Sequence, residues 1–119
     1  MSDERLWTFY IEDMIDFTGK AIAYCQGLDR TAFTTNTLVY DATLRNLELI
    51  GEAATRVPAL VREGYPDIPW RQVIATRNRL IHGYLGIDDD ILWSIIQDDL
   101  PKLLEQLDAL RAAHSKPRL

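Results

Sequence analysis

Residues 37–57 read TLVYDATLRNLELIGEAATRV, and their periodicity indicates the fold class. Apolar side chains recur along the stretch at steps of four or three: Tyr40, Leu44, Leu47 and Ile50. Such spacing predicts one long amphipathic helix, because residues three and four apart lie on the same helical face. Pro58 is expected to end it, since proline in a helix interior removes a backbone hydrogen bond. Gly51 has no side chain and would let another helix approach closely.

The segment before this stretch shows the same periodicity. Residues 2–26 are predicted to form a helix that Gly27 closes. The expected buried stripe of this helix follows steps of four and three: Leu6, Tyr10, Met14, Phe17, Ala21 and Tyr24. Residues 28–36 contain several threonines and are expected to form a loop.

Two further long helices are predicted downstream. Residues 69–81 begin with Pro69, which suits the first position of a helix. Asp88 can cap a last helix over residues 88–113. Pro101 interrupts that last pattern, and a kink is expected there rather than a break. The side chains expected to face inward from the last helix are apolar: Ile91, Ile95, Leu103, Leu107 and Leu110.

Four substantial helices joined by short connections favour an all-α fold, an antiparallel helical bundle of four to five helices. A short helix over residues 58–63, stopped by Gly64, would be the fifth. We expect residues 1–113 to form one domain, since 119 residues suffice for a single core. Residues 114–119 have little to bury and are expected to form a flexible C-terminal tail.

Composition limits the function. The net charge of −5 argues against a protein that coats nucleic acid, because such binding needs many Lys and Arg contacts to phosphates. No apolar run approaches the roughly 20 residues of a membrane span, and a charged start argues against a secretory signal, so we expect a cytoplasmic protein without membrane contact. The single cysteine, Cys25, cannot form an internal disulfide and is expected to be a packed thiol. No Cys/His cluster has zinc-site spacing, so neither a metal nor a cofactor is expected.

Residues 77–84, RNRLIHGY, gather the groups best able to handle a phosphodiester. An arginine such as Arg77 can stabilise phosphate charge through a planar fork of donors, whereas a histidine such as His82 can exchange a proton near neutral pH. On a helix, Asn78 and His82 share a face, but Arg77 and His82 lie roughly 140° apart. One chain alone therefore splays the arginine and the histidine, which favours a dimer that brings in a second copy of the motif.

The pattern of arginine, four residues, histidine, one residue and tyrosine is filled by Arg77, His82 and Tyr84, with Asn78 after the arginine. It resembles the HEPN superfamily and, within it, the HepT-like ribonuclease toxins, formerly a domain of unknown function numbered 86. The likeness covers roughly residues 5–110 and includes three flanking blocks: residues 44–54, 68–70 and 93–104.

The resemblance implies a metal-independent endoribonuclease toxin of a type VII-like toxin–antitoxin system, acting on an RNA such as tRNA or mRNA. Arg77 and His82 would be catalytic, and Asn78 would support them by orienting the imidazole or by capping the adjacent turn. The chain would act as a homodimer with its active site at the interface. A cognate MntA-like nucleotidyltransferase antitoxin would neutralise it by attaching AMP to Tyr84.

Other interpretations stay open at this stage. The protein could be a non-catalytic helical module that pairs with a nucleotidyltransferase or binds nucleotide or RNA. His82 could simply cap the carbonyls at a helix end. Glu52, four residues after Glu48, could pair with a motif arginine rather than hold a metal. Arg79 is expected to steer RNA from the surface, and the three tryptophans are expected to pack in the core or an interface: Trp7, Trp70 and Trp93.

Overall fold

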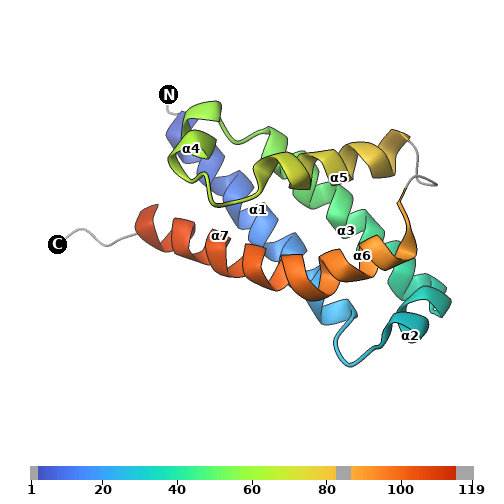
Figure 1. The fold of residues 1–119 in the computed structure, drawn as a ribbon. Helices are drawn as coiled ribbons and strands as arrows, with labels where there is room; N and C mark the ends of the chain where they lie inside the picture. The colour runs from blue at the N-terminus through green and yellow to red at the C-terminus, as the bar shows by residue number, and fades with distance from the viewer. Residues whose placement is uncertain (1–2, 83–86, 115–119) are drawn as a thin grey trace.

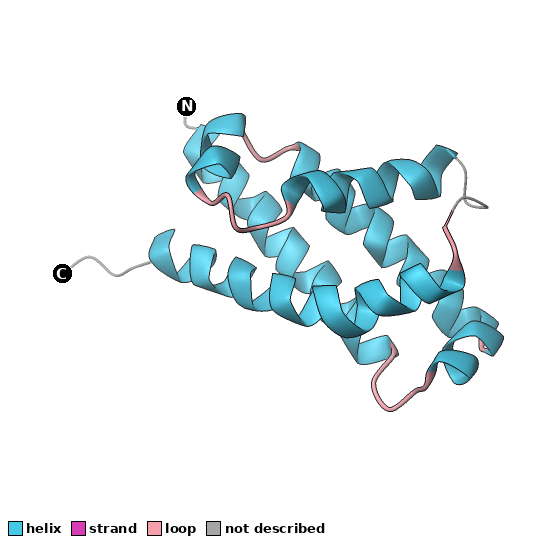
Figure 2. Cartoon of the chain, viewed as in Figure 1, coloured by secondary structure: helices cyan, strands magenta, loops and turns pink. Residues whose placement is uncertain are grey.

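The computed structural model describes residues 3–82 and 87–114, and regular structure in these ranges is entirely helical. The predicted all-α class is therefore confirmed (Figures 1 and 2). The helices have these bounds: α1 Asp3–Tyr24, α2 Arg30–Thr35, α3 Thr37–Thr55, α4 Ala59–Gly64, α5 Trp70–His82, α6 Asp89–Ser94 and α7 Leu100–His114. A π-helical turn, Ile95–Asp99, joins α6 to α7.

Helix α3 is the centre of the arrangement, because it packs against both α1 and α5, while α7 packs on α1. The consecutive long helices α1, α3, α5 and α6–α7 run in alternating directions (Figure 1). This matches the predicted antiparallel bundle with four substantial helices and a short helix after Pro58. A core of apolar side chains from α1, α3 and α7 includes Met14, Ile50 and Leu107, which are almost completely buried.

The prediction of a loop over residues 28–36 was wrong, because these residues contain α2. Asp29 caps it by accepting a hydrogen bond from the Ala32 backbone amide at 2.8 Å. Phe33 is fully buried and contacts the rings of Tyr40 and Trp93, with centroids 5.2 and 5.3 Å away. Threonine has weak helix propensity. The burial of the Phe33 ring therefore stabilises α2 more than the threonines disfavour it.

The buried stripe predicted for the first helix was also partly wrong. Met14 and Ala21 are buried as expected, but Leu6 and Tyr24 are 53% and 39% exposed. The buried side chains of α1 and of the turn after it are mostly displaced by one position from the prediction: Trp7, Ile11, Met14, Ile15, Thr18 and Ala21 in the helix, and Cys25 in the turn. Apolar residues occupy neighbouring stripes of this helix, and its contacts with both α3 and α7 decide which stripe is covered.

The last helical segment is not broken at Pro101, since the chain stays helical from Asp89 to His114. The π-helical turn lies just before the proline, and the Leu100 amide donates to the Ile95 carbonyl five residues earlier. The predicted inward position of Ile91 was wrong, since Ile91 is 50% exposed and the neighbouring Leu92 is buried instead. The buried residues of this region are Leu92, Ile96, Leu100, Leu103, Leu107 and Leu110.

Helix α7 ends at His114, one residue beyond the end expected for the last helix. The His114 Nε2 lies 2.9 Å from the Tyr65 hydroxyl, and the His114 ring meets that of Trp7 edge-on at 4.9 Å. These two aromatic contacts give the histidine a place in the fold that its position near the C-terminus did not suggest. The remaining tail residues, 115–119, lie outside the described ranges.

Helix α5 approaches α3 closely at Gly51, as the sequence predicted. A Cβ atom placed on Gly51 would overlap the Cβ of Arg77 on α5 and would lie 3.0 Å from the Val73 carbonyl oxygen. Since both obstructing atoms belong to or adjoin the α5 backbone, they cannot rotate away. Glycine is therefore required here for α5 to lie this close to α3.

This contact gives a stability prediction. Gly51→Ala should lower the free energy of unfolding by about 1–3 kcal/mol, because the added methyl group overpacks the α3–α5 contact. Gly19→Ala is the matched control, since a Cβ there meets no atom within 4 Å and alanine should stabilise α1 by roughly 0.5–1 kcal/mol. Urea unfolding of both variants measures the difference. A Gly51→Ala protein as stable as the Gly19→Ala protein would contradict the close approach.

Candidate functional site

Helix α5 carries the arginine and histidine of the 77–84 motif, and both of its ends are defined. It starts after Pro69, as predicted, and Trp70 is buried with its indole Nε1 donating to the Tyr65 carbonyl at 3.0 Å. Leu80 is buried in the core near the other end. These two anchors fix the rotation of α5, and with it the directions of the residues between them.

Arg77 points toward α3 and is held by two side chains. Its Nη2 donates to Glu52 Oε1 at 2.6 Å, and its Nη1 donates to Asn78 Oδ1 at 2.8 Å. The side chain is only 25% exposed, and its Nε is buried without a hydrogen-bond partner among the described residues. The proposed pairing of Glu52 with a motif arginine is confirmed. The guanidinium is thus fixed in direction while part of its donor set remains unused.

Glu52 responds electrostatically to this pairing. The hydrogen bond from Arg77, followed by the attraction of its charge, lowers the pKa of the Glu52 carboxyl below its ordinary value of 4.5. Arg56 adds a weaker contact, with Nη2 3.5 Å from Glu52 Oε2. Glu52 therefore stays ionised at neutral pH and supplies a fixed negative partner that orients Arg77.

Asn78 and His82 lie on another face of α5 from Arg77. Asn78 is exposed, and its amide oxygen is used by Arg77, so its contact is with the guanidinium. His82 is the exposed last residue of α5. The rise of an α-helix places it roughly 6 Å along the axis from Asn78. The structure thus brings Arg77 and Asn78 together and leaves the imidazole accessible.

Tyr84, the expected modification site, lies outside the described residues, as do residues 83–86 as a whole. The chain is described again from Ile87, and the start of α6 is firmly tied to the bundle. The Tyr40 hydroxyl donates to Asp89 Oδ1 at 2.7 Å, and Arg30 forms an ion pair with Asp90. Burial and the Asp89 contact raise the pKa of Tyr40 to about 12, so this hydrogen bond persists well above neutral pH.

The other residues singled out in the sequence have structural surroundings. Cys25 is buried with its Sγ 3.6 Å from Thr43 Oγ1, and burial raises the pKa of its thiol, as expected for a packed cysteine. Trp7 and Trp70 are buried in the core, and Trp93 packs on Phe33. Glu48 pairs with Arg45 at 3.0 Å. Arg79 is exposed in the last turn of α5.

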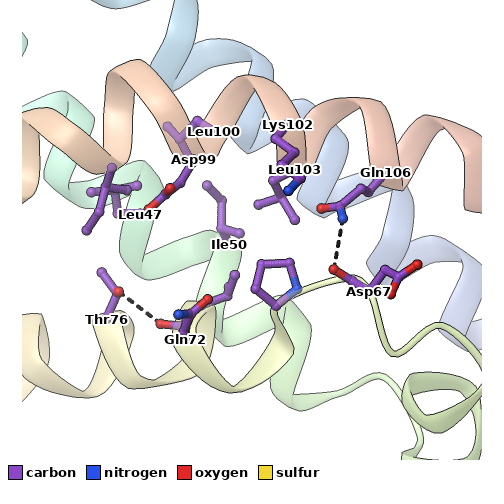
Figure 3. Close-up of a pocket in the computed structure, with 13 residues that line it drawn as sticks. Leu47, Ile50, Asp67, Gln72, Thr76, Asp99, Leu100, Lys102, Leu103 and Gln106 are labelled. Atoms are coloured by element: carbon purple, nitrogen blue, oxygen red, sulfur yellow. Dashed lines mark hydrogen bonds between the residues drawn. The ribbon is translucent and has the colours of Figure 1, made fainter.

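A groove of about 290 Å³ runs between α5 and α7, with Ile50 of α3 at its floor (Figure 3). Thr76 belongs to the side of α5 that lines it, and Asp99 and Lys102 come from the opposite wall. On a helical wheel, Asn78 and His82 lie roughly 160° and 120° from Thr76. The groove therefore opens on a different face of α5 from the histidine and is separate from the motif site.

Within residues 3–82 and 87–114, no group of three or more His, Cys, Asp or Glu is arranged to hold a metal ion. In the same ranges, no helix has both the length and the apolar character needed to cross a membrane.

The Arg77–Glu52 pair predicts a pH-dependent stability. A carboxyl with a lowered pKa in the folded state stabilises the fold above its ordinary value of 4.5, and this stabilisation is lost as the pH falls through the lowered pKa. Glu52→Gln should thus be less stable than the parent at neutral pH, and the difference should shrink at an acidic pH below the ordinary value of 4.5.

Glu48→Gln is the control, because it removes the same charge one turn earlier, where the partner is Arg45. Denaturant unfolding at both pH values measures each difference. A Glu52→Gln protein with parental stability at neutral pH would show that the pair does not hold α5 to α3.

Comparison with known proteins identifies the family. A family described as "Ribonuclease HepT-like" matches residues 10–110. A Methanocaldococcus jannaschii protein named as a candidate RNase is 33% identical over 99 residues, which are 83% of this chain and 91% of that protein. A Caldanaerobacter subterraneus protein with a similar name is 31% identical over 98 residues, 82% and 88% of the two chains.

A third relative, from Thermococcus cleftensis, is named as a candidate ribonuclease HepT. It is 40% identical over 70 residues, which cover 59% of this chain and 64% of that protein. No solved structure gave a significant match. The matched region contains α3, the Gly51 contact and the whole of α5, so the resemblance seen in the motif extends through the fold, and the chain belongs to the HepT-like ribonuclease family.

Proposed function

We propose that this protein is a metal-independent endoribonuclease in which Arg77 and His82 are catalytic and Asn78 supports Arg77. The observation that carries the proposal is the state of Arg77. Its Nη2 donates to Glu52 and its Nη1 to Asn78, each of these nitrogens carries a second N–H, and the exposed His82 lies on the same helix. An oriented donor set with unused capacity suits an acceptor that arrives with the substrate, such as a phosphate oxygen.

The proposed reaction uses the ribose 2′-hydroxyl as nucleophile. One His82 removes the 2′-hydroxyl proton as the oxygen attacks the adjacent phosphorus, and a general acid returns a proton to the departing 5′-oxygen. Arg77 stabilises the negative charge that develops on the phosphorane oxygens. The bond to the 5′-oxygen breaks, which leaves a 2′,3′-cyclic phosphate on one fragment and a 5′-hydroxyl on the other.

A homodimer supplies the second proton-transfer group. Arg77 and His82 are five residues apart on α5, or roughly 140° around its axis, so one chain does not direct both toward the same phosphate. Two chains related by a two-fold axis bring two copies of the motif, one from each chain, to one interface. A second His82 would then act as general acid while the first acts as base.

The first test compares His82→Ala with the parent on total RNA in excess chelator. Removing the imidazole should reduce the cleavage rate by at least about 100-fold, the usual contribution of general acid–base catalysis. His114→Ala is the matched control, since it removes the other histidine, which contacts Tyr65 and Trp7. Cleavage by His82→Ala at the parental rate, or loss of parental cleavage on adding chelator, would contradict the mechanism.

We further propose that the enzyme is the toxin of a toxin–antitoxin pair and that a nucleotidyltransferase antitoxin silences it by attaching AMP to Tyr84. The tyrosine lies two residues after His82 in the sequence. Attached nucleotide would add negative charge and bulk beside the groups that must bind an RNA phosphate, and so would repel the substrate.

Tyr84→Phe tests this regulation directly. Incubation with the cognate transferase and ATP should abolish RNA cleavage by the parent but leave Tyr84→Phe active, since phenylalanine has no hydroxyl to accept AMP. Intact mass before and after incubation reports the number of AMP groups attached. Complete silencing of Tyr84→Phe would show that the transferase acts elsewhere on the protein.

A further inference from the structure

A second depression, of about 540 Å³, lies between α4 and the first part of α5. Arg62 and Glu63 of α4 line one side, and Arg71 and Asn78 of α5 line the other. We call these four residues the basic basin, since two guanidinium groups face one carboxylate there. The small Ala59 and Ala75 side chains leave the space open.

The guanidinium of Arg62 is incompletely paired. Its Nε is buried and makes no hydrogen bond within the described part of the chain. A buried N–H without an acceptor leaves the Arg62 charge poorly compensated, so an anion bound at the part of the side chain that lines the basin would be favoured. Asn78 adds a second donor, because Arg77 occupies its amide oxygen and leaves its amide nitrogen available.

The α5 residues of the basic basin lie on the same face of α5 as His82. Arg71, Asn78 and His82 fall within roughly 40° of one another around the helix axis. The rise per residue puts Arg71 roughly 16 Å and Asn78 roughly 6 Å from His82 along that axis. A polyanion that lies on this face therefore passes from the arginines, over a residue of the motif, to the imidazole.

We propose that the basic basin is a subsite for the backbone phosphates of single-stranded RNA, beyond the phosphate that is cleaved. This inference rests on the proposed ribonuclease function and adds how the substrate strand is held. Arg62 and Arg71 bind phosphates through charge-assisted hydrogen bonds, and Asn78 joins this subsite to the catalytic groups. A protein with a net charge of −5 gains a local RNA track in this way without a generally basic surface.

Binding measured on uncut RNA tests the subsite independently of catalysis. In a His82→Ala background, Arg62→Ala and Arg71→Ala should each weaken the affinity for a ten-nucleotide RNA roughly tenfold. Each loss of a phosphate contact should also lower the slope of log affinity against log salt by about 0.7. Lys102→Ala is the matched control, because it removes one positive charge in the groove on another side of α5 and should change neither quantity.

The length and form of the ligand separate the possible sources of phosphate. The loss of affinity caused by Arg62→Ala and by Arg71→Ala should be smaller for a dinucleotide, which is too short to reach from His82 to Arg71. Inorganic phosphate and a mononucleotide should bind much more weakly than the ten-nucleotide RNA. Tight mononucleotide binding that is lost in Arg62→Ala would overturn the RNA subsite in favour of a nucleotide site.

Thermal unfolding of each variant, together with Arg62→Lys and Arg71→Lys, controls for folding, since lysine keeps the charge and should restore part of the affinity. Parental affinity and salt slope in the Arg62→Ala, Arg71→Ala double variant would overturn the proposal. Absence of RNA cleavage by the parent would contradict the ribonuclease mechanism alone, because the contribution of the two arginines to RNA binding is read from uncut RNA.

Discussion

The approach of α5 to α3 at Gly51 is the constraint on which the site depends. The glycine lets the backbone around Arg77 come so close that the arginine side chain is directed along α3 to Glu52. An arginine side chain that is only 25% exposed would be costly without a charged partner, and Glu52 offers one at 2.6 Å. One missing side chain thus determines both the packing of two helices and the orientation of the Arg77 guanidinium.

The site combines a fixed group with an accessible one. Arg77 is restrained by Glu52 and Asn78 before any substrate binds, so little reorganisation is needed when negative charge develops on a phosphate. His82 is exposed at the end of α5, where the chain passes into the segment with Tyr84. The angle between the two groups is a property of the helix itself, which is why we assign the complete site to a pair of chains.

Much of the fold could be predicted from the sequence because its long helices have strong periodicity and clear end signals. Pro58, Pro69 and Asp88 all lie at element boundaries, and Gly51 marks the helix contact as expected. The predictions were wrong where contacts between helices determine which residues are helical or buried. The burial of Phe33 forms α2 against a weak local preference, and contacts with α3 and α7 select the buried stripe of α1. The π-helical turn before Pro101 has no signal in the sequence periodicity.

The candidate site could also be predicted only in part from the sequence. The sequence led us to propose Arg77, Asn78 and His82 as site residues, and it raised the pairing of Glu52 with a motif arginine, which the structure shows. It gave no reason to select Arg62, which lies in a short helix and meets α5 only in the folded chain. A contact between segments that are distant in sequence has no local signature.

The chemical nature of the RNA ends is the most direct test of the central claim, that a ribose 2′-hydroxyl attacks the phosphate under the control of Arg77 and His82. A synthetic RNA cut at one position by the unmodified protein should yield a 2′,3′-cyclic phosphate and a 5′-hydroxyl, resolved by mass spectrometry of the two fragments. A 3′-hydroxyl paired with a 5′-phosphate would contradict the account, because those ends require attack by water rather than by the substrate's own hydroxyl.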